Sequence, residues 1–165
     1  MTLQVPLTVF AAAAGMLLWT VPAFGHDHPF TAVLSGAGQS PSNGSPAVGF
    51  ASGEYDTHSN IFHFEVEAHG FMGLLTGGSI HVGGPGSAGP ATLALSSALG
   101  STEWFSHDVF LLTEEQEMEL MTGNLYVNIR SEAFPDGEIR GQIVPAPGAL
   151  AAAGLMGLAV LRRRR

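Results

Sequence analysis

The feature that most constrains this chain is an alternation of apolar and polar residues on both sides of a Pro-Asp-Gly turn at 135–137. The apolar positions are Leu125, Val127, Ile129, Ile139 and Ile143. Alternation interrupted by residues that favour a tight turn is typical of a β-hairpin with one buried face. The pattern predicts that Arg130, Glu138 and Arg140 lie on the outward face and pair across the strands.

Similar signals predict further strands and one helix. Strands are expected at 30–34, 47–55, 61–68, 79–82, 90–95 and 104–111, with Trp104, Phe105 and Phe110 in the core. The spacing of Thr113 and Gln116 predicts a capping box, and the helix that it starts should close at Gly123. The expected fold is all-β: an antiparallel immunoglobulin-like sandwich or barrel of seven or eight strands, flanked by apolar helices at both ends.

The N-terminal end has the features of a signal peptide. Residues 7–19 form an apolar run too short to span a bilayer, and small residues follow at Ala23 and Gly25. We expect residues 1–25 to be removed by cleavage before His26. The alternative is a buried core helix, which the nearby Pro22 and Gly25 disfavour.

The C-terminal end predicts a membrane anchor. Residues 143–161 carry no charge, and four arginines follow them; such a segment is near the minimum length to span a bilayer, and its basic end would stay cytoplasmic. The tail resembles the PEP-CTERM sorting signal of Gram-negative bacteria, which an exosortase-type enzyme processes, with Ala146 where the usual motif has Glu. The signal residues would be Val144, Pro145, Pro147, Arg162, Arg163, Arg164 and Arg165.

These ends divide the chain into an exported domain, 26–144, and a tail, 145–165. Once the tail is set aside, Arg130 and Arg140 face fourteen acidic residues, which gives a formal charge of −12. Such a surface repels phosphate backbones, so nucleic acid is not an expected partner. The chain has no cysteine, which excludes thiol catalysis and cysteine-ligated metal.

Four segments of the exported domain resemble the chordin-type (CHRD) domain family. They are 30–36, 45–49, 80–90 and 124–143. The motif residues are Ile80, His81, Gly83, Tyr126, Asn128, Gly137, Glu138, Arg140 and Gly141. The resemblance implies an all-β extracellular domain. Ser79 and Arg130 stand where the family commonly has histidines, so a family metal site would lack two of its three candidate ligands.

Histidines are the best candidate site residues. His81 is the first metal candidate, with His63 or His107 as partners, and the alternative is that His81 bonds loop backbone. A chain that begins at His26 would also have an amine and His28 placed to bind Cu(II), unless this terminus is simply polar and unliganded. Glu54, Glu65 and Glu67 could hold Ca²⁺, although a solvated acidic face is the preferred interpretation.

No convergent catalytic set appears, so we expect the protein not to be an enzyme. The predicted function is an exported, membrane-tethered module of the envelope or extracellular matrix of a Gram-negative bacterium. Its partners would be the membrane, an exosortase-type enzyme, and a polysaccharide or an envelope protein. The alternative is a periplasmic protein that binds copper or zinc through the histidines above.

Overall fold

The structure is a computed structural model that describes residues 27–96 and 99–146. The predicted signal peptide, His26 and the tail from Pro147 onward lie outside these residues. No helix in the described ranges is both long enough and apolar enough to cross a bilayer. The elements are β1 (Asp27–Ser35), η1 (Gly36–Gly38), β2 (Val48–Asp56), β3 (Ile61–His69), β4 (Leu75–Val82), β5 (Ala91–Ala94), β6 (Trp104–Leu111), α1 (Glu114–Met121), β7 (Leu125–Ser131), β8 (Ile139–Gln142) and β9 (Val144–Pro145).

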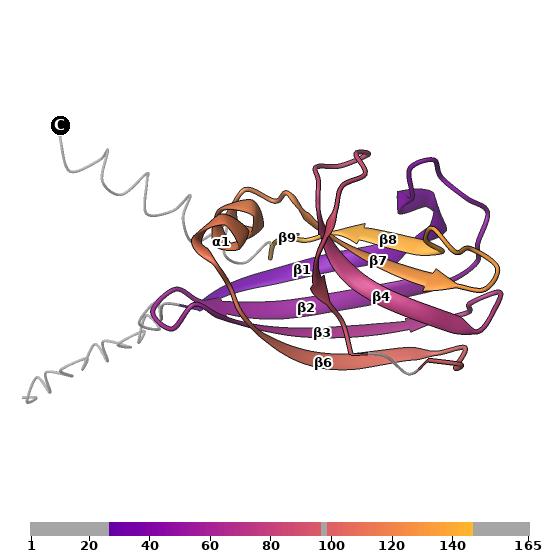
Figure 1. Ribbon diagram of the computed structural model, residues 1–165, viewed down its shortest axis with the longest axis horizontal. Helices are drawn as coiled ribbons and strands as arrows, with labels where there is room; N and C mark the ends of the chain where they lie inside the picture. The colour runs from indigo at the N-terminus through magenta and orange to yellow at the C-terminus, as the bar shows by residue number, and fades with distance from the viewer. Residues whose placement is uncertain (1–26, 97–98, 147–165) are drawn as a thin grey trace, which may run out of the picture.

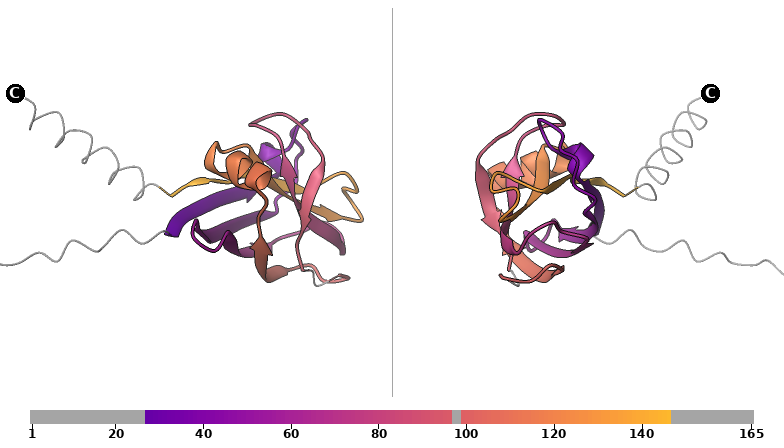
Figure 2. Two further views of the ribbon diagram at one scale, coloured as in Figure 1. Left: turned by 60° about the vertical axis from the view of Figure 1, so that its left-hand side comes forward. Right: turned by 90° about the vertical axis from the view of Figure 1, so that its right-hand side faces the viewer.

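The strands form one antiparallel sheet in the order β5-β4-β7-β8-β1-β2-β3-β6, with β9 paired to β1. The sheet curls into a nearly closed barrel, seen from the side in Figure 1 and from two further directions in Figure 2. The expected all-β fold is confirmed in its barrel form. The predicted hairpin is β7 and β8, in which Asn128 pairs with Arg140.

A loop joins the two edge strands of the sheet. Oδ1 of Asp108 on β6 accepts a hydrogen bond from the backbone N–H of Ser96, just after β5, at 2.9 Å. The backbone N–H of Leu75 on β4 donates to the carbonyl of Ser101 at 2.8 Å, and Gly100 donates back to Leu75 at 3.0 Å. These bonds attach the loop between β5 and β6 to both β4 and β6, on the side of the barrel that no strand pairing closes.

The inner face of the sheet forms the core. Its largest fully buried side chains are Trp104, Tyr55, Phe30, Phe62, Phe64, Leu34, Ile80, Leu120, Leu125, Ile129, Ile139 and Ile143. Leu120 comes from α1, whose predicted capping box is confirmed: the backbone N–H of Gln116 donates to Oγ1 of Thr113, and its Oε1 accepts from the backbone N–H of Thr113.

The prediction for Phe105 is wrong. Trp104, Ser106 and Asp108 face the barrel interior, so Phe105 faces outward and is 64% exposed, while Phe110 is half-buried. These inward polar groups are largely paired: Trp104 Nε1 donates to Oγ of Ser106, and Oδ1 of Asp108 accepts from Ser96, whereas Oδ2 of Asp108 has no protein partner among the described residues. Strand β4 also starts earlier than predicted, at Leu75.

Candidate functional site

Two surfaces contain the predicted site residues. The first is the outer side of β4, β7 and β8, where two loops, 36–46 and 83–90, cover a row of polar side chains. We call this row the polar cluster. Its members are Ser79, His81, Tyr126, Asn128, Glu138, Arg140 and Gln142.

Glu138 lies at one end of the polar cluster and is fully buried. Its carboxylate accepts hydrogen bonds from Oγ of Ser45 at 2.7 Å, from the backbone N–H of Met72 at 2.8 Å and from Oγ of Ser131. Glu138 thus occupies the predicted outward position of the hairpin, but other segments of the chain bury it. Segments far away in the sequence fold over the hairpin and supply neutral donors, so one carboxylate ties together three separate parts of the chain.

Arg140 also occupies its predicted outward position and is also buried beneath a loop. Its guanidinium lies 3.5 Å from the centroid of the Tyr126 ring, and Nη2 donates to the carbonyl of Gly84 at 3.0 Å. Burial lowers the pKa of Arg140, and the nearby Tyr126 partly opposes this shift. The predicted cross-strand ion pair is replaced by stacking and a loop carbonyl, and Arg130 alone of the three is exposed as predicted.

His81 stacks on Tyr126, the same ring that the Arg140 guanidinium contacts. Its ring centroid lies 5.1 Å from that of Tyr126, with 20° between the planes. One ring nitrogen, Nδ1, lies 2.9 Å from the carbonyl of Gly89, and the other, Nε2, lies 2.9 Å from Oγ of Ser79. The interpretation that His81 bonds loop backbone is confirmed, and both of its nitrogens are engaged.

Asn128 and Gln142 fix the remaining loop backbone. Oδ1 of Asn128 accepts from Nε2 of Gln39 at 2.8 Å, and its Nδ2 donates to the carbonyl of Asp136. Gly137 has φ +148°, and a Cβ there would lie 2.2 Å from Oδ1 of Asn128, so only glycine fits this turn. Nε2 of Gln142 donates to the carbonyls of Gly83, Gly123 and Leu125. The polar cluster is thus a framework that holds loops.

The second surface is the outer side of β1, β2, β3 and β6, and no segment that the structure describes covers it. We call it the open face. It presents rungs of paired residues across the four strands: Val33–Phe50–Glu67–Phe105, Thr31–Ser52–Glu65–His107 and Pro29–Glu54–His63–Val109. Its exposed large apolar side chains are Val33, Val48, Phe50, Phe105, Val109 and Leu111.

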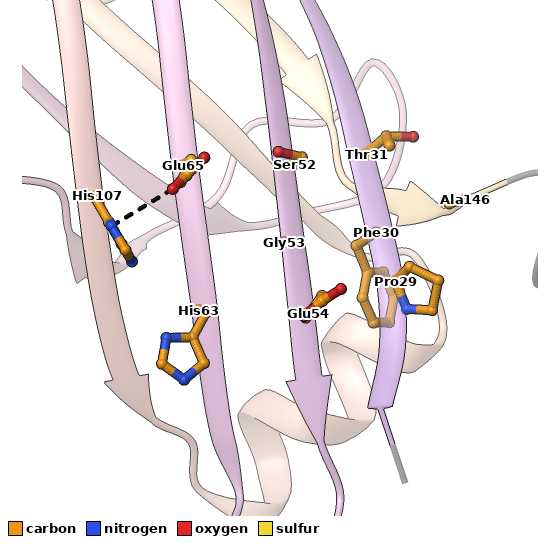
Figure 3. Close-up of a pocket in the computed structure, with 10 residues that line it drawn as sticks. All are labelled: Pro29, Phe30, Thr31, Ser52, Gly53, Glu54, His63, Glu65, His107 and Ala146. Atoms are coloured by element: carbon orange, nitrogen blue, oxygen red, sulfur yellow. Dashed lines mark ion pairs between the residues drawn. The ribbon is translucent and has the colours of Figure 1, made fainter. Parts of the chain in front are cut away.

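A groove of about 580 Å³ crosses the open face, and Figure 3 shows its lining. His107 Nδ1 lies 3.5 Å from Oε1 of Glu65, and both side chains are 54% exposed. The ring centroids of His63 and His107 are 6.4 Å apart. Ala146, the last described residue, lines the same groove from the β9 side.

The structure separates the predicted metal ligands. His81 belongs to the polar cluster, His63 and His107 belong to the open face, and His28 lies on β1 opposite Tyr55. Within residues 27–96 and 99–146, no group of three or more His, Asp or Glu side chains is placed to hold a metal ion. Copper at a His26 terminus falls outside the described residues and stays a prediction.

A family model for the CHRD domain matches residues 30–143. The chain belongs to the CHRD domain family. CHRD domains are generally extracellular, secreted modules. No curated protein and no solved structure matches the chain.

In this CHRD domain, the motif residues and the open face lie apart. The motif residues of β4, β7 and β8 support the core or hold loops; a Cβ at Gly141, for example, would lie 2.6 Å from the carbonyl oxygen of Val33. Sequence reasoning missed the apolar residues of the open face. The available signal was that β6 carries large apolar residues at both odd-numbered and even-numbered positions. Because neighbouring residues of a strand face opposite sides, one of the two sets had to face outward.

Proposed function

We propose that this CHRD domain is a non-catalytic, exported binding module that holds a partner on its open face. The observation that carries the proposal is the group of six exposed, large apolar side chains on one side of a four-stranded sheet. Single exposed apolar residues are ordinary, but a gathering of them on one face is typical of a binding surface. A partner that covers them would remove their apolar surface from water, which stabilises the complex by about 25 cal/mol per Å² of buried area.

The chemistry of both surfaces supports a role without catalysis. In the polar cluster, loop backbone and neighbouring side chains already occupy the carboxylate of Glu138 and both ring nitrogens of His81. On the open face, Glu65 and His107 are more than half exposed, where water screens their charges. An acid or a base gains catalytic strength from an enclosed site of low dielectric; the open face is not enclosed, and the enclosed carboxylate of Glu138 is already taken up by protein donors.

The tail determines where in the cell the proposed module would be held. The backbone N–H of Ala146 donates to the carbonyl of Pro29 at 2.9 Å, so the chain leaves the barrel beside β1. We propose that the apolar segment that follows tethers the domain to the inner membrane, with the domain outside, until a processing enzyme releases it. This part rests on the fifteen uncharged residues 147–161 that follow the barrel and on the four arginines after them, whose long side chains can reach back to the membrane interface.

The test is a pull-down with the full chain from envelope fractions of the cells that produce it, both solubilised in detergent so that insertion of the tail into membrane is not counted as binding. Phe50→Ser with Phe105→Ser should reduce the bound amount about tenfold, because truncating aromatic residues at the centre of an interface commonly costs more than about 1 kcal/mol and about 1.4 kcal/mol is a tenfold change in Kd. Met118→Ser, on α1 and 60% exposed, is the matched control and should leave binding unchanged. Equal binding by all variants, or turnover of a glycoside, ester or peptide substrate, would refute the proposal.

A further inference from the structure

We infer that the partner held on the open face is a polypeptide segment that combines basic and apolar side chains. This inference rests on the proposed function, which says only that the face binds. Three features of the face favour such a partner over others: its charge, the arrangement of its apolar residues, and its poor fit to other occupants.

The open face carries negative charge and no basic side chain except histidine. Strands β1, β2, β3 and β6 contain no Lys and no Arg. Their outward positions include Glu54, Glu65 and Glu67, whereas Arg130 and Arg140 lie on β7 and β8. A partner that buries these carboxylates must bring cations, because an unpaired charge is costly to remove from water.

The carboxylates alternate with apolar groups across the strands. Glu67 lies between Phe50 and Phe105 in one rung. Neighbouring strands are about 4.8 Å apart, so the backbones that carry the two rings lie roughly 10 Å from each other with Glu67 on the strand between them. In an extended segment, side chains at i, i+2 and i+4 point to the same side, so apolar, basic and apolar residues at these positions can place a cation over Glu67 while the apolar groups cover the rings.

Other occupants match these features less well. A second copy would bring carboxylates against carboxylates. Anionic polymers would meet the same repulsion. A neutral polysaccharide could stack on the phenyl rings, but it would leave the carboxylates without cations and the exposed Val33 and Val109 without aliphatic partners.

The experiment measures binding of a labelled peptide to the full chain by fluorescence anisotropy. The probe is a twelve-residue peptide in which Lys and an apolar residue (Val, Leu or Phe) take turns at every second position with Ser between, so that both kinds lie on one side of the extended chain; its counterpart has Glu in place of Lys. A soluble glucosamine oligomer, which is cationic but lacks apolar side chains, is the third ligand. Each is measured at about 0.01 M and about 0.15 M salt, where the Debye length falls from roughly 30 Å to roughly 8 Å.

We expect the Lys peptide to bind, to weaken at higher salt, and to bind at least ten times more tightly than the Glu peptide. Glu67→Gln and Phe105→Ser should each weaken it several-fold, while Glu119→Gln and Met118→Ser on α1 should not. Equal binding of both peptides, with Phe105→Ser weakening both, would overturn the inference and leave the proposed function standing. Binding insensitive to Phe105→Ser would count against both.

Three further results would assign the face to another occupant and overturn the inference. The first is tight, Phe105-dependent binding of the glucosamine oligomer in preference to the Lys peptide. The second is a tenfold gain in Lys-peptide affinity when Arg162→Gln, Arg163→Gln, Arg164→Gln and Arg165→Gln are combined, since the chain's own basic tail would then be the occupant. The third is a dimer, seen by sedimentation velocity, that Phe105→Ser dissociates; a second copy of the chain would then be the occupant.

Discussion

Glu65 and His107 are register partners on β3 and β6, and their side chains lie 3.5 Å apart on the open face. Both are 54% exposed, so water screens the pair and it contributes little to folding. The side chains of this pair can therefore bind a partner without a loss of folding stability. This separates the open face from the polar cluster, where every side chain except Ser79 bonds to a residue outside the strands.

The first prediction concerns the stability of the open face. Glu65→Gln and His107→Gln should each change the free energy of unfolding by less than about 0.5 kcal/mol, as is usual for exposed positions. Urea denaturation of the full chain gives the measurement. A loss above about 1.5 kcal/mol in either variant would mean that the pair supports the fold, contrary to the account.

The second prediction concerns the buried carboxylate of Glu138. Glu138→Gln replaces an acceptor with an amide that cannot receive all three donors, so a buried group loses its partner. The free energy of unfolding should fall by about 1–3 kcal/mol. Glu132→Gln, an exposed position in the same hairpin, is the control and should be neutral. Equal stability of the two variants in urea would show that the carboxylate does not hold the loops.

The third prediction concerns the glycine loop over the polar cluster. A Cβ at Gly89 would lie 1.7 Å from the carbonyl oxygen of Val82, which is backbone and cannot move aside. Gly89→Ala should therefore cost about 2 kcal/mol or more. Gly44→Ala is the matched control, since a Cβ there meets nothing within 4 Å. Thermal unfolding followed by circular dichroism compares them, and similar melting temperatures would contradict the described loop path.

The fourth prediction concerns alkaline pH. Burial, reinforced by a hydrogen bond to Glu117 and its negative charge, raises the pKa of Tyr55 to about 12. In the unfolded chain the phenol ionises near pH ~10, so above that pH the unfolded state loses this proton first. The stability that Tyr55 contributes should be complete below pH ~10 and decline between pH ~10 and the folded-state value.

Urea midpoints measured from pH 8 upward would check this decline. Tyr55→Phe removes the phenol and should flatten the fall, although it also loses the hydrogen bond to Oδ1 of Asn60. Tyr126→Phe removes the chain's other phenol and should leave the contribution of Tyr55 in place. The same alkaline slope in the wild type and in Tyr55→Phe would show that Tyr55 is not responsible.

The sequence predicted what short-range signals determine. The hairpin of β7 and β8, the bounds of β6 and the capping box at Thr113 all depend on residues near one another in the chain, and the structure contains each of them. The clean alternation in β3 also predicted correctly that Glu65 and Glu67 face outward.

The failures concern contacts between distant segments. Glu138 and Arg140 occupy outward positions of their strand, as their alternation required, but loops cover them: Ser45 is 93 residues away from Glu138, and Gly84 is 56 residues away from Arg140. For Phe105, the alternation along β6 showed which residues share a face, but it did not show which of the two faces lies inside the barrel. The open face depends on strand order, since Phe50 and Phe105 share a rung only because β3 lies between β2 and β6.

The most direct test of the account is site-specific photo-cross-linking in the cells that produce the protein. A photoreactive amino acid is placed at Phe105, at Phe50 or, as the control, at the equally exposed Met118 of α1, and adducts are identified by mass spectrometry. The account predicts that positions 50 and 105 cross-link to the same molecule and that position 118 does not. Adducts that are absent at 50 and 105, or equally abundant at 118, would contradict the claim that the open face is the binding surface.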